Sequence, residues 1–165
     1  MLRYFIVLAL FLANVGCGRS VWPAHIKFNS NTMSPDVTFV LTQYVKDLNK
    51  LMDQKVLKFD SDTDPDSLRS YTIFVKLALE DVEGNKAGIA EVGPYDCFIT
   101  IYPLAYRSDI VKTVLWHEIG HCVGLRHIDV GREIMSPGVG HFSSYPEQKI
   151  RNFRNDFLLM FRLLQ

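Results

Sequence analysis

The segment from His117 to His127 constrains this chain more than any other, because it reads His-Glu-Ile-Gly-His-Cys-Val-Gly-Leu-Arg-His. If its first part is helical, His117 and His121 lie about 40° apart around the helix axis and about 6 Å apart along it. Both imidazoles can then reach one metal ion. Gly124 suits the left-handed conformation that ends a helix, and a chain that turns back there brings His127 to the same ion.

Three histidine ligands leave one position open on a tetrahedral zinc ion, and an open position is typical of a catalytic zinc rather than a structural one. Glu118 follows the first histidine by one residue, so it is rotated by about 100° and lies beside the open position. Zinc lowers the pKa of bound water towards about 7, and a neighbouring carboxylate can take the proton and pass it to a leaving amine. The pattern predicts one catalytic Zn²⁺ on His117, His121 and His127, with Glu118 as general base in amide hydrolysis.

These residues resemble the signature of the metzincin zinc peptidases, His-Glu-x-x-His-x-x-Gly-x-x-His followed by a methionine turn. The segment Ile134-Met135-Ser136-Pro137 resembles that Met-turn. Its spacing from His127 is most similar to the matrixin branch, the matrix metalloproteinase type of catalytic domain. The resemblance covers nearly the whole chain after its first residues, and it implies a peptidase.

The resemblance also implies roles for residues outside the histidine motif. Met135 would form an apolar floor under the zinc without binding it. Gly88 and Ala90 stand in the region of an edge strand that binds an extended peptide through backbone hydrogen bonds, and an ordinary solvent-exposed edge strand is the alternative. Pro137 belongs to a segment that would form one wall of the pocket for the side chain after the cleaved bond.

Hydrophobic periodicity predicts an α+β domain around this site. Helices are expected from Ser34-Pro35 to Met52 and from Tyr145 onward, and Ser108-Asp109 is expected to cap the helix that carries the histidines. Strands are expected at residues 25–29, 55–59, 71–79, 86–92 and 97–102. The expected fold is metzincin-like: a mixed, twisted sheet of about five strands with a zinc-binding active-site helix, a Met-turn and a C-terminal helix.

The start of the chain has the pattern of a secretory signal peptide. Arg3 precedes an apolar run from Tyr4 to Ala13, which is shorter than the roughly 20 residues needed to span a bilayer. We expect residues 1–18 to be a signal peptide and residues 19–165 to be the catalytic domain of a protein that is secreted or held in the cell envelope. A lipid anchor on Cys17 is the alternative to simple cleavage, and would be the only attachment to a membrane.

Composition limits the remaining choices. The chain has 165 residues, of which 48% are hydrophobic and 22% charged, as in one ordinary globular domain. The formal net charge is zero, and no basic field indicates binding to nucleic acid. The predicted peptidase chemistry implies a protein or peptide substrate as the partner, and we expect a monomer.

Three features leave alternatives open. Cys97 and Cys122 form either a disulfide or two buried free thiols. The acidic stretch at residues 60–66 invites a calcium site, but it lacks the glycine and glutamate of an EF-hand loop, so a solvated turn is favoured. Asp129 and Glu133 either orient the metal ligands or lie at the surface, and a surface position is favoured.

Two other functions fit the same residues. A catalytically silent domain stabilised by zinc would bind a partner without cleaving it. A zinc hydrolase could instead act on a non-peptide amide such as cell-wall material. Chelator-sensitive proteolysis would distinguish the predicted zinc endopeptidase from the silent domain, and a comparison of peptides with peptidoglycan would distinguish it from the other hydrolase.

Overall fold

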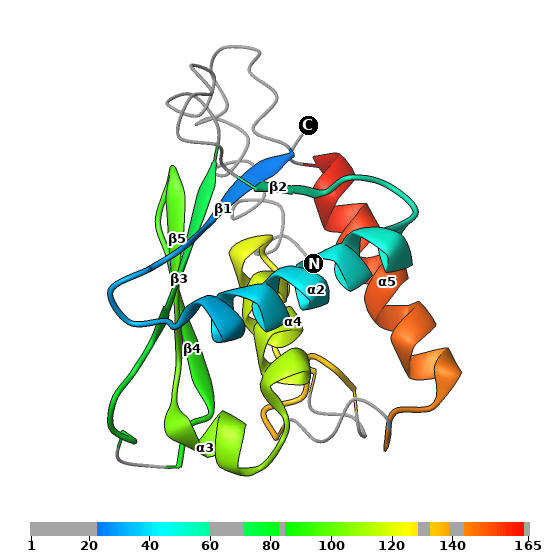
Figure 1. Ribbon diagram of the computed structural model, residues 1–165. Helices are drawn as coiled ribbons and strands as arrows, with labels where there is room; N and C mark the ends of the chain where they lie inside the picture. Colours follow the sequence, from blue (N-terminus) through cyan, green and yellow to red (C-terminus); the bar gives the residue numbers. More distant parts are fainter. Residues whose placement is uncertain (1–22, 60–70, 83–84, 129–132, 139–143, 164–165) are drawn as a thin grey trace.

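A computed structural model describes residues 23–59, 71–82, 85–128, 133–138 and 144–163 (Figure 1). The expected signal peptide, the acidic stretch and Asp129 lie outside these residues. The described elements follow in the order β1 (Ala24–Phe28), α2 (Pro35–Met52), β2 (Leu57–Phe59), β3 (Thr72–Leu77), β4 (Gly88–Val92), β5 (Asp96–Ile101), α3 (Pro103–Arg107), α4 (Val111–Cys122) and α5 (Glu147–Leu163). The predicted α+β fold is confirmed, with most strands shorter than expected.

The sheet is mixed, as predicted, and has the strand order β2-β1-β3-β5-β4. The four adjacent strands β2, β1, β3 and β5 run parallel to one another. The edge strand β4 alone is antiparallel, and it pairs with β5. Figure 1 shows α2 and α4 against the same side of the sheet, with α5 beyond them. The buried side chains of β3 and β5, such as Ile73, Val75, Ile99 and Ile101, face these helices and form the core.

Helix α2 begins as its sequence predicts. The Ser34 hydroxyl accepts a hydrogen bond from the Val37 N–H at 3.4 Å, and Pro35 occupies the first turn, where the missing N–H costs nothing. The apolar positions recur at helical spacing, and Leu41, Val45, Leu48 and Met52 are buried. The helix is therefore fixed to the sheet by one apolar stripe.

Helix α4 is the central element of the molecule. Every side chain from Thr113 to Glu118 is buried, so this helix is enclosed on all sides rather than on one face. It packs on β4 and β5, while the Trp116 indole N–H donates to the Tyr44 carbonyl of α2 at 2.9 Å. The ring of Trp116 also stacks on Phe153 of α5. A helix held from three directions is a rigid base for metal ligands.

The prediction that Ser108-Asp109 caps this helix was wrong. A short helix, α3, intervenes, and the Ser108 N–H closes it by donating to the Leu104 carbonyl. Asp109 then takes a left-handed conformation with φ of 51°, and α4 starts after Ile110 without a side-chain cap. The reason is that Pro103 opens a helical turn of its own directly after β5.

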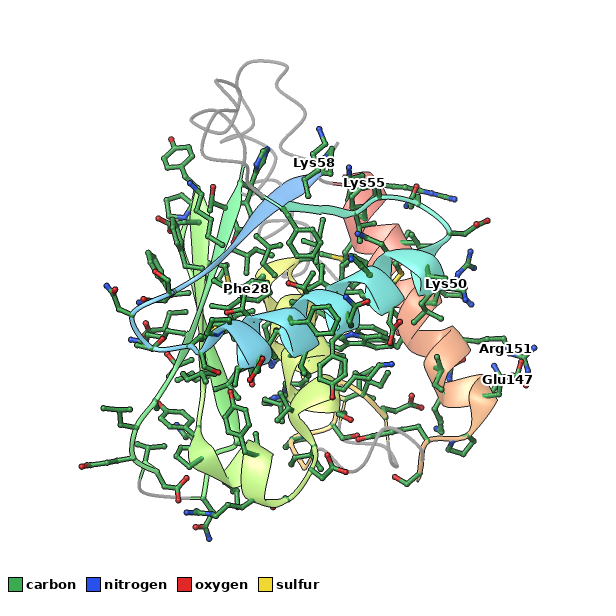
Figure 2. All side chains as sticks on the ribbon, viewed as in Figure 1. Phe28, Lys50, Lys55, Lys58, Glu147 and Arg151 are labelled. Atoms are coloured by element: carbon green, nitrogen blue, oxygen red, sulfur yellow. A yellow bond between two sulfur atoms is a disulfide. The ribbon has the colours of Figure 1, made fainter. Side chains whose placement is uncertain are left out.

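Helix α5 covers the side of α4 that is remote from the sheet. Its buried residues are Phe153, Phe157 and Phe161, spaced by one helical turn. Figure 2 shows Glu147 and Arg151 on the outer side of α5, where they form an exposed ion pair with an N–O distance of 3.7 Å. Among the described residues, neither this nor any other helix combines the length and the apolar character needed to cross a bilayer.

Candidate metal and catalytic site

The three predicted histidine ligands converge. The Nε2 atoms of His117 and His121 are 3.1 Å apart, those of His117 and His127 are 3.1 Å apart, and those of His121 and His127 are 3.2 Å apart. Three nitrogens at about 2.05 Å from a tetrahedral zinc would be separated by about 3.3 Å. The triangle therefore has the size that one zinc ion requires, and these residues can hold one metal ion.

The outer nitrogens of two histidines are held by backbone carbonyls. The His117 Nδ1 lies 2.6 Å from the Ile134 carbonyl oxygen, and the His121 Nδ1 lies 2.8 Å from that of Leu125. A neutral imidazole that donates through Nδ1 carries its lone pair on Nε2, the atom that each of these rings points at the metal position. Burial lowers the pKa of His117 to about 4 and also lowers the pKa of His121, which favours the neutral, metal-binding form.

The turn that brings in His127 is built on Gly124, as the sequence predicts. Gly124 has φ of 93°, and its N–H donates to the His121 carbonyl, while the Leu125 N–H donates to the Gly120 carbonyl. These two bonds form a Schellman motif, which satisfies the last carbonyls of α4 and reverses the chain. His127 itself is exposed, so the metal position opens toward solvent on its side.

Glu118 lies beside the histidines but is buried, with 5% of its surface exposed. Burial raises the pKa of its carboxyl group to about 7, and a hydrogen bond from the Ala90 N–H opposes that rise. Gly88, two residues earlier on β4, also adjoins this side chain, because a Cβ on Gly88 would lie 2.8 Å from the Glu118 Oε1. The structure thus brings Gly88 and Ala90 of the edge strand against the carboxylate.

Met135 is buried beneath the histidine helix, with 2% of its surface exposed. Its sulfur approaches Gly120 so closely that a Cβ there would lie 2.5 Å from it. The Met135 carbonyl accepts a hydrogen bond from the Ile128 N–H, one residue after the third ligand. Pro137 follows on the outside and is exposed. The Met-turn thus packs against α4 and pairs with the chain that carries His127.

Glu133, expected at the surface, is instead buried with 7% exposed. Its carboxylate forms a short ion pair with Lys149 of α5, and its N–H donates to the Ser136 hydroxyl. The expectation was wrong because a carboxylate can be buried when a cation from a distant element neutralises it.

The two cysteines that remained ambiguous form a disulfide. Cys97 of β5 is bonded to Cys122, the last residue of α4. Both residues are buried. The bond ties the end of the helix that carries His117 and His121 to β5, an inner strand of the sheet.

Sequence reasoning missed Gly120 as a part of the site. A glycine inside a helical pattern costs about 1 kcal/mol relative to alanine and usually has a packing reason, so it was a usable signal. It also missed Lys149, whose role could not be found in the sequence, because the partner carboxylate lies 16 residues away on another element.

Comparisons with known proteins agree with this geometry. A family model described as dual-action HEIGH metallo-peptidase matches residues 24–143. The five letters of that description are the sequence at residues 117–121, which begins and ends with two of the converging histidines. A comparison with curated proteins found no match.

The match supports a metallopeptidase with a zinc cofactor, and it does not support the narrower matrixin subtype that the Met-turn spacing indicated. The match spans well over half of the chain and contains α4, the turn at Gly124 and the Met-turn. The histidine triangle and the matched sequence both indicate a binding site for one Zn²⁺ ion. On these grounds the chain belongs to the dual-action HEIGH metallo-peptidase family.

Proposed function

We propose that this protein is a zinc-dependent endopeptidase that is exported from the cell and cleaves extended protein or peptide segments. The observation that carries the proposal is the triangle of His117, His121 and His127 nitrogens, 3.1 to 3.2 Å on a side, with the buried Glu118 carboxylate on the helix that carries the first two. Zinc, when bound there, polarises the scissile carbonyl and lowers the pKa of a water molecule.

Each residue of the site has a separate role in this proposal. The three histidines hold the ion, and the Ile134 and Leu125 carbonyls keep two of their rings in one orientation. Glu118 takes a proton from the attacking water and later donates it to the nitrogen of the leaving amine. In the metal-free protein burial raises the pKa of its carboxyl group to about 7, and a group that titrates near neutral pH can accept and release a proton.

The substrate would bind as an added strand at the free edge of β4. Within the described residues β4 pairs on one side only, with β5, so its other side offers backbone donors and acceptors. An edge of this kind recognises an extended backbone whatever its side chains, which suits an endopeptidase. Pro137 is exposed beside the buried Met135, and in this proposal it lines one wall of the substrate pocket.

The decisive test is the variant Glu118→Ala. We expect the purified, zinc-loaded variant to retain one zinc ion per chain and to lose at least about a hundredfold in turnover of a denatured protein substrate, because a general base contributes on the order of 10²–10⁴ to the rate. Metal analysis and mass spectrometry of the cleavage products measure both quantities. Chelation of the parent protein should abolish cleavage, and zinc should restore it.

Other results would replace the proposal. Equal cleavage by parent and variant would remove Glu118 from the reaction. A parent that is stabilised by zinc but cuts no peptide would be a silent binding domain, and one that releases fragments only from peptidoglycan would be a hydrolase of a different amide.

Export is supported by two separate observations. The apolar run from Tyr4 to Ala13 has the length of the apolar region of a signal peptide, and disulfides such as Cys97–Cys122 are typical of an oxidising compartment. Expression of the full chain, followed by mass determination of the protein recovered outside the cytoplasm, should give a mass reduced by the first residues. A mass increased by lipid at Cys17 would identify an anchored form, and an uncleaved cytoplasmic product would contradict export.

A further inference from the structure

The backbone of β4 alternates in direction, and the alternation can be worked out from its pairing with β5. The Gly93 N–H donates to the Asp96 carbonyl and the Tyr102 N–H donates to the Ala87 carbonyl, so these two pairs bracket the ladder. Hydrogen-bonded pairs in an antiparallel ladder recur at every second residue. The polar backbone groups of Ile89 and Glu91 therefore point to β5, while those at 88, 90 and 92 point to the free edge.

One of these outward groups already has a partner inside the protein. The Ala90 N–H points toward the side of the strand where the Glu118 carboxylate lies, and as a backbone donor it lowers the pKa of that carboxylate. The neighbouring Gly88 has no side chain, and a Cβ there would lie 2.8 Å from the Glu118 Oε1 and 3.1 Å from its Cγ. The carboxylate is thus seated against the strand between positions 88 and 90.

We propose that the Ala90 amide is a positioning group that holds the Glu118 carboxylate, and that a peptide bound at this edge pairs with Gly88 and Val92 instead of with the Ala90 N–H. This inference rests on the proposed function, because it divides one strand edge between the general base and the substrate. A single N–H can serve only one acceptor well, and a carboxylate is a stronger acceptor than a peptide carbonyl. Gly88 has no side chain and therefore leaves the space that the Glu118 carboxylate occupies.

The hydrogen bond can be tested without any substrate. In the full-length, zinc-loaded protein labelled with ¹⁵N, we expect the Ala90 amide to exchange with solvent at least about tenfold more slowly than the Val92 amide, which also points to the free edge. Glu118→Ala should abolish this difference, because exchange of the Ala90 amide should accelerate while exchange of the Val92 amide stays the same. If Ala90 exchanges as fast as Val92 in the parent, or is equally slow in the variant, the proposed bond does not exist.

Proline substitution tests whether the Ala90 N–H serves Glu118 while Val92 serves the substrate. Proline removes one backbone N–H and is tolerated on an edge strand. Ala90→Pro should lower kcat by about ten- to a hundredfold, with the zinc content unchanged and KM within about twofold of the parent value. The matched variant Val92→Pro removes an N–H of the same direction and should raise KM while kcat is kept. An Ala90→Pro variant with a raised KM and an intact kcat would assign that N–H to the substrate and overturn the proposal.

A second route avoids proline, in case Ala90→Pro fails to fold. A Cβ at position 88 would also lie 2.6 Å from the Val114 Cγ1, so Gly88→Ala is best made in a Val114→Ala background, where that contact is absent. Relative to Val114→Ala alone, the double variant should have a lower kcat and faster exchange of the Ala90 amide. Its zinc affinity should equal that of Val114→Ala. Unchanged kcat and unchanged exchange would contradict the seating of the carboxylate. If the parent cleaves no peptide, the proposed function fails, and the exchange experiment still decides whether the bond exists.

Discussion

Gly120 shows how the absence of one side chain allows the Met-turn to pack closely against the histidine helix. It lies inside α4, where a glycine is unfavourable by about 1 kcal/mol relative to alanine. The sulfur of Met135 occupies the place of its Cβ at 2.5 Å, and that methionine is almost fully buried and has little room to move. The close contact between the Met-turn and the histidine helix therefore depends on a glycine at this position.

We expect Gly120→Ala to destabilise the protein despite its better helix propensity. Inserting a methyl group into a packed core costs about 1–3 kcal/mol, and with the Met135 sulfur only 2.5 Å from the new Cβ we expect the upper half of that range, which outweighs the propensity gain of about 1 kcal/mol. In a Met135→Ala background the obstacle is gone, so the same substitution should raise the free energy of unfolding. Urea denaturation of the four proteins measures both effects. An equal loss in the two backgrounds would mean that Met135 is not the obstacle.

The buried groups of the site also predict how the metal-free protein responds to acid. Burial lowers the pKa of His117 from an ordinary value of 6.5 to about 4, so the unfolded chain binds this proton first as the pH falls. The free energy of unfolding should therefore decrease between pH 6.5 and pH 4, by up to about 3 kcal/mol from this group. His121, whose pKa is also lowered, acts in the same direction.

Glu118 opposes this trend. Burial raises the pKa of its carboxyl group from 4.5 to about 7, so the folded protein binds this proton first and gains stability as the pH falls from 7 to 4.5. Metal-free Glu118→Gln lacks the opposing contribution, and its stability should decrease more steeply than that of the parent between pH 6.5 and pH 4.5. Urea denaturation of the chelated proteins at three pH values tests this, and parallel curves would contradict it.

At the scale of elements, the end of α4 was predictable from the sequence and its beginning was not. Gly124 is the type of residue that a helix needs for a left-handed end, and the Schellman motif forms there. Ser108 and Asp109 are equally typical of a helix start, but the preceding α3 ends on them. A capping residue indicates that a helix boundary is near, and only tertiary structure decides which helix it belongs to.

The disulfide belongs to the same scale. Periodicity placed Cys97 on a strand and Cys122 on the histidine helix, and it left open whether their sulfurs meet. That distance depends on how α4 lies on β5, with Cα atoms 5.7 Å apart in the structure. A sequence pattern gives the face on which a residue lies, and the packing of two elements gives its partner.

Gly124→Ala should weaken both folding and metal binding. A residue with a Cβ is strained by about 1–2 kcal/mol in a left-handed conformation, and this Cβ would also lie 2.9 Å from the Met160 Cε. Because His127 follows the turn, we expect a lower melting temperature together with a lower zinc affinity. Gly138→Ala is the matched control, since nothing lies within 4 Å of its added Cβ. Equal effects of the two substitutions would show that the turn does not position His127.

At the scale of the whole molecule, the site is held between the sheet and α5. The sequence predicted the order of these parts and the identity of the converging histidines, because both follow from local spacing. It did not predict how α5 reaches the site. Glu133 precedes Ile134, whose carbonyl orients His117, and the Glu133 carboxylate pairs with Lys149 of α5. The C-terminal helix thereby contacts the support of a metal ligand.

Lys149→Met should therefore affect the metal as well as the fold. Its removal leaves the buried Glu133 carboxylate without its cation. Breaking a fully buried pair typically costs about 3–5 kcal/mol, and the cost should be smaller here because the lysine is partly exposed. The support of His117 then loosens, and zinc affinity in competition with a chelator should fall together with the melting temperature. Arg151→Met removes an exposed cation from the same helix, and its effect on stability should be below about 1 kcal/mol with zinc affinity unchanged. If Lys149→Met lowers the melting temperature and leaves zinc affinity at the parent value, then α5 stabilises the domain without positioning the ligand.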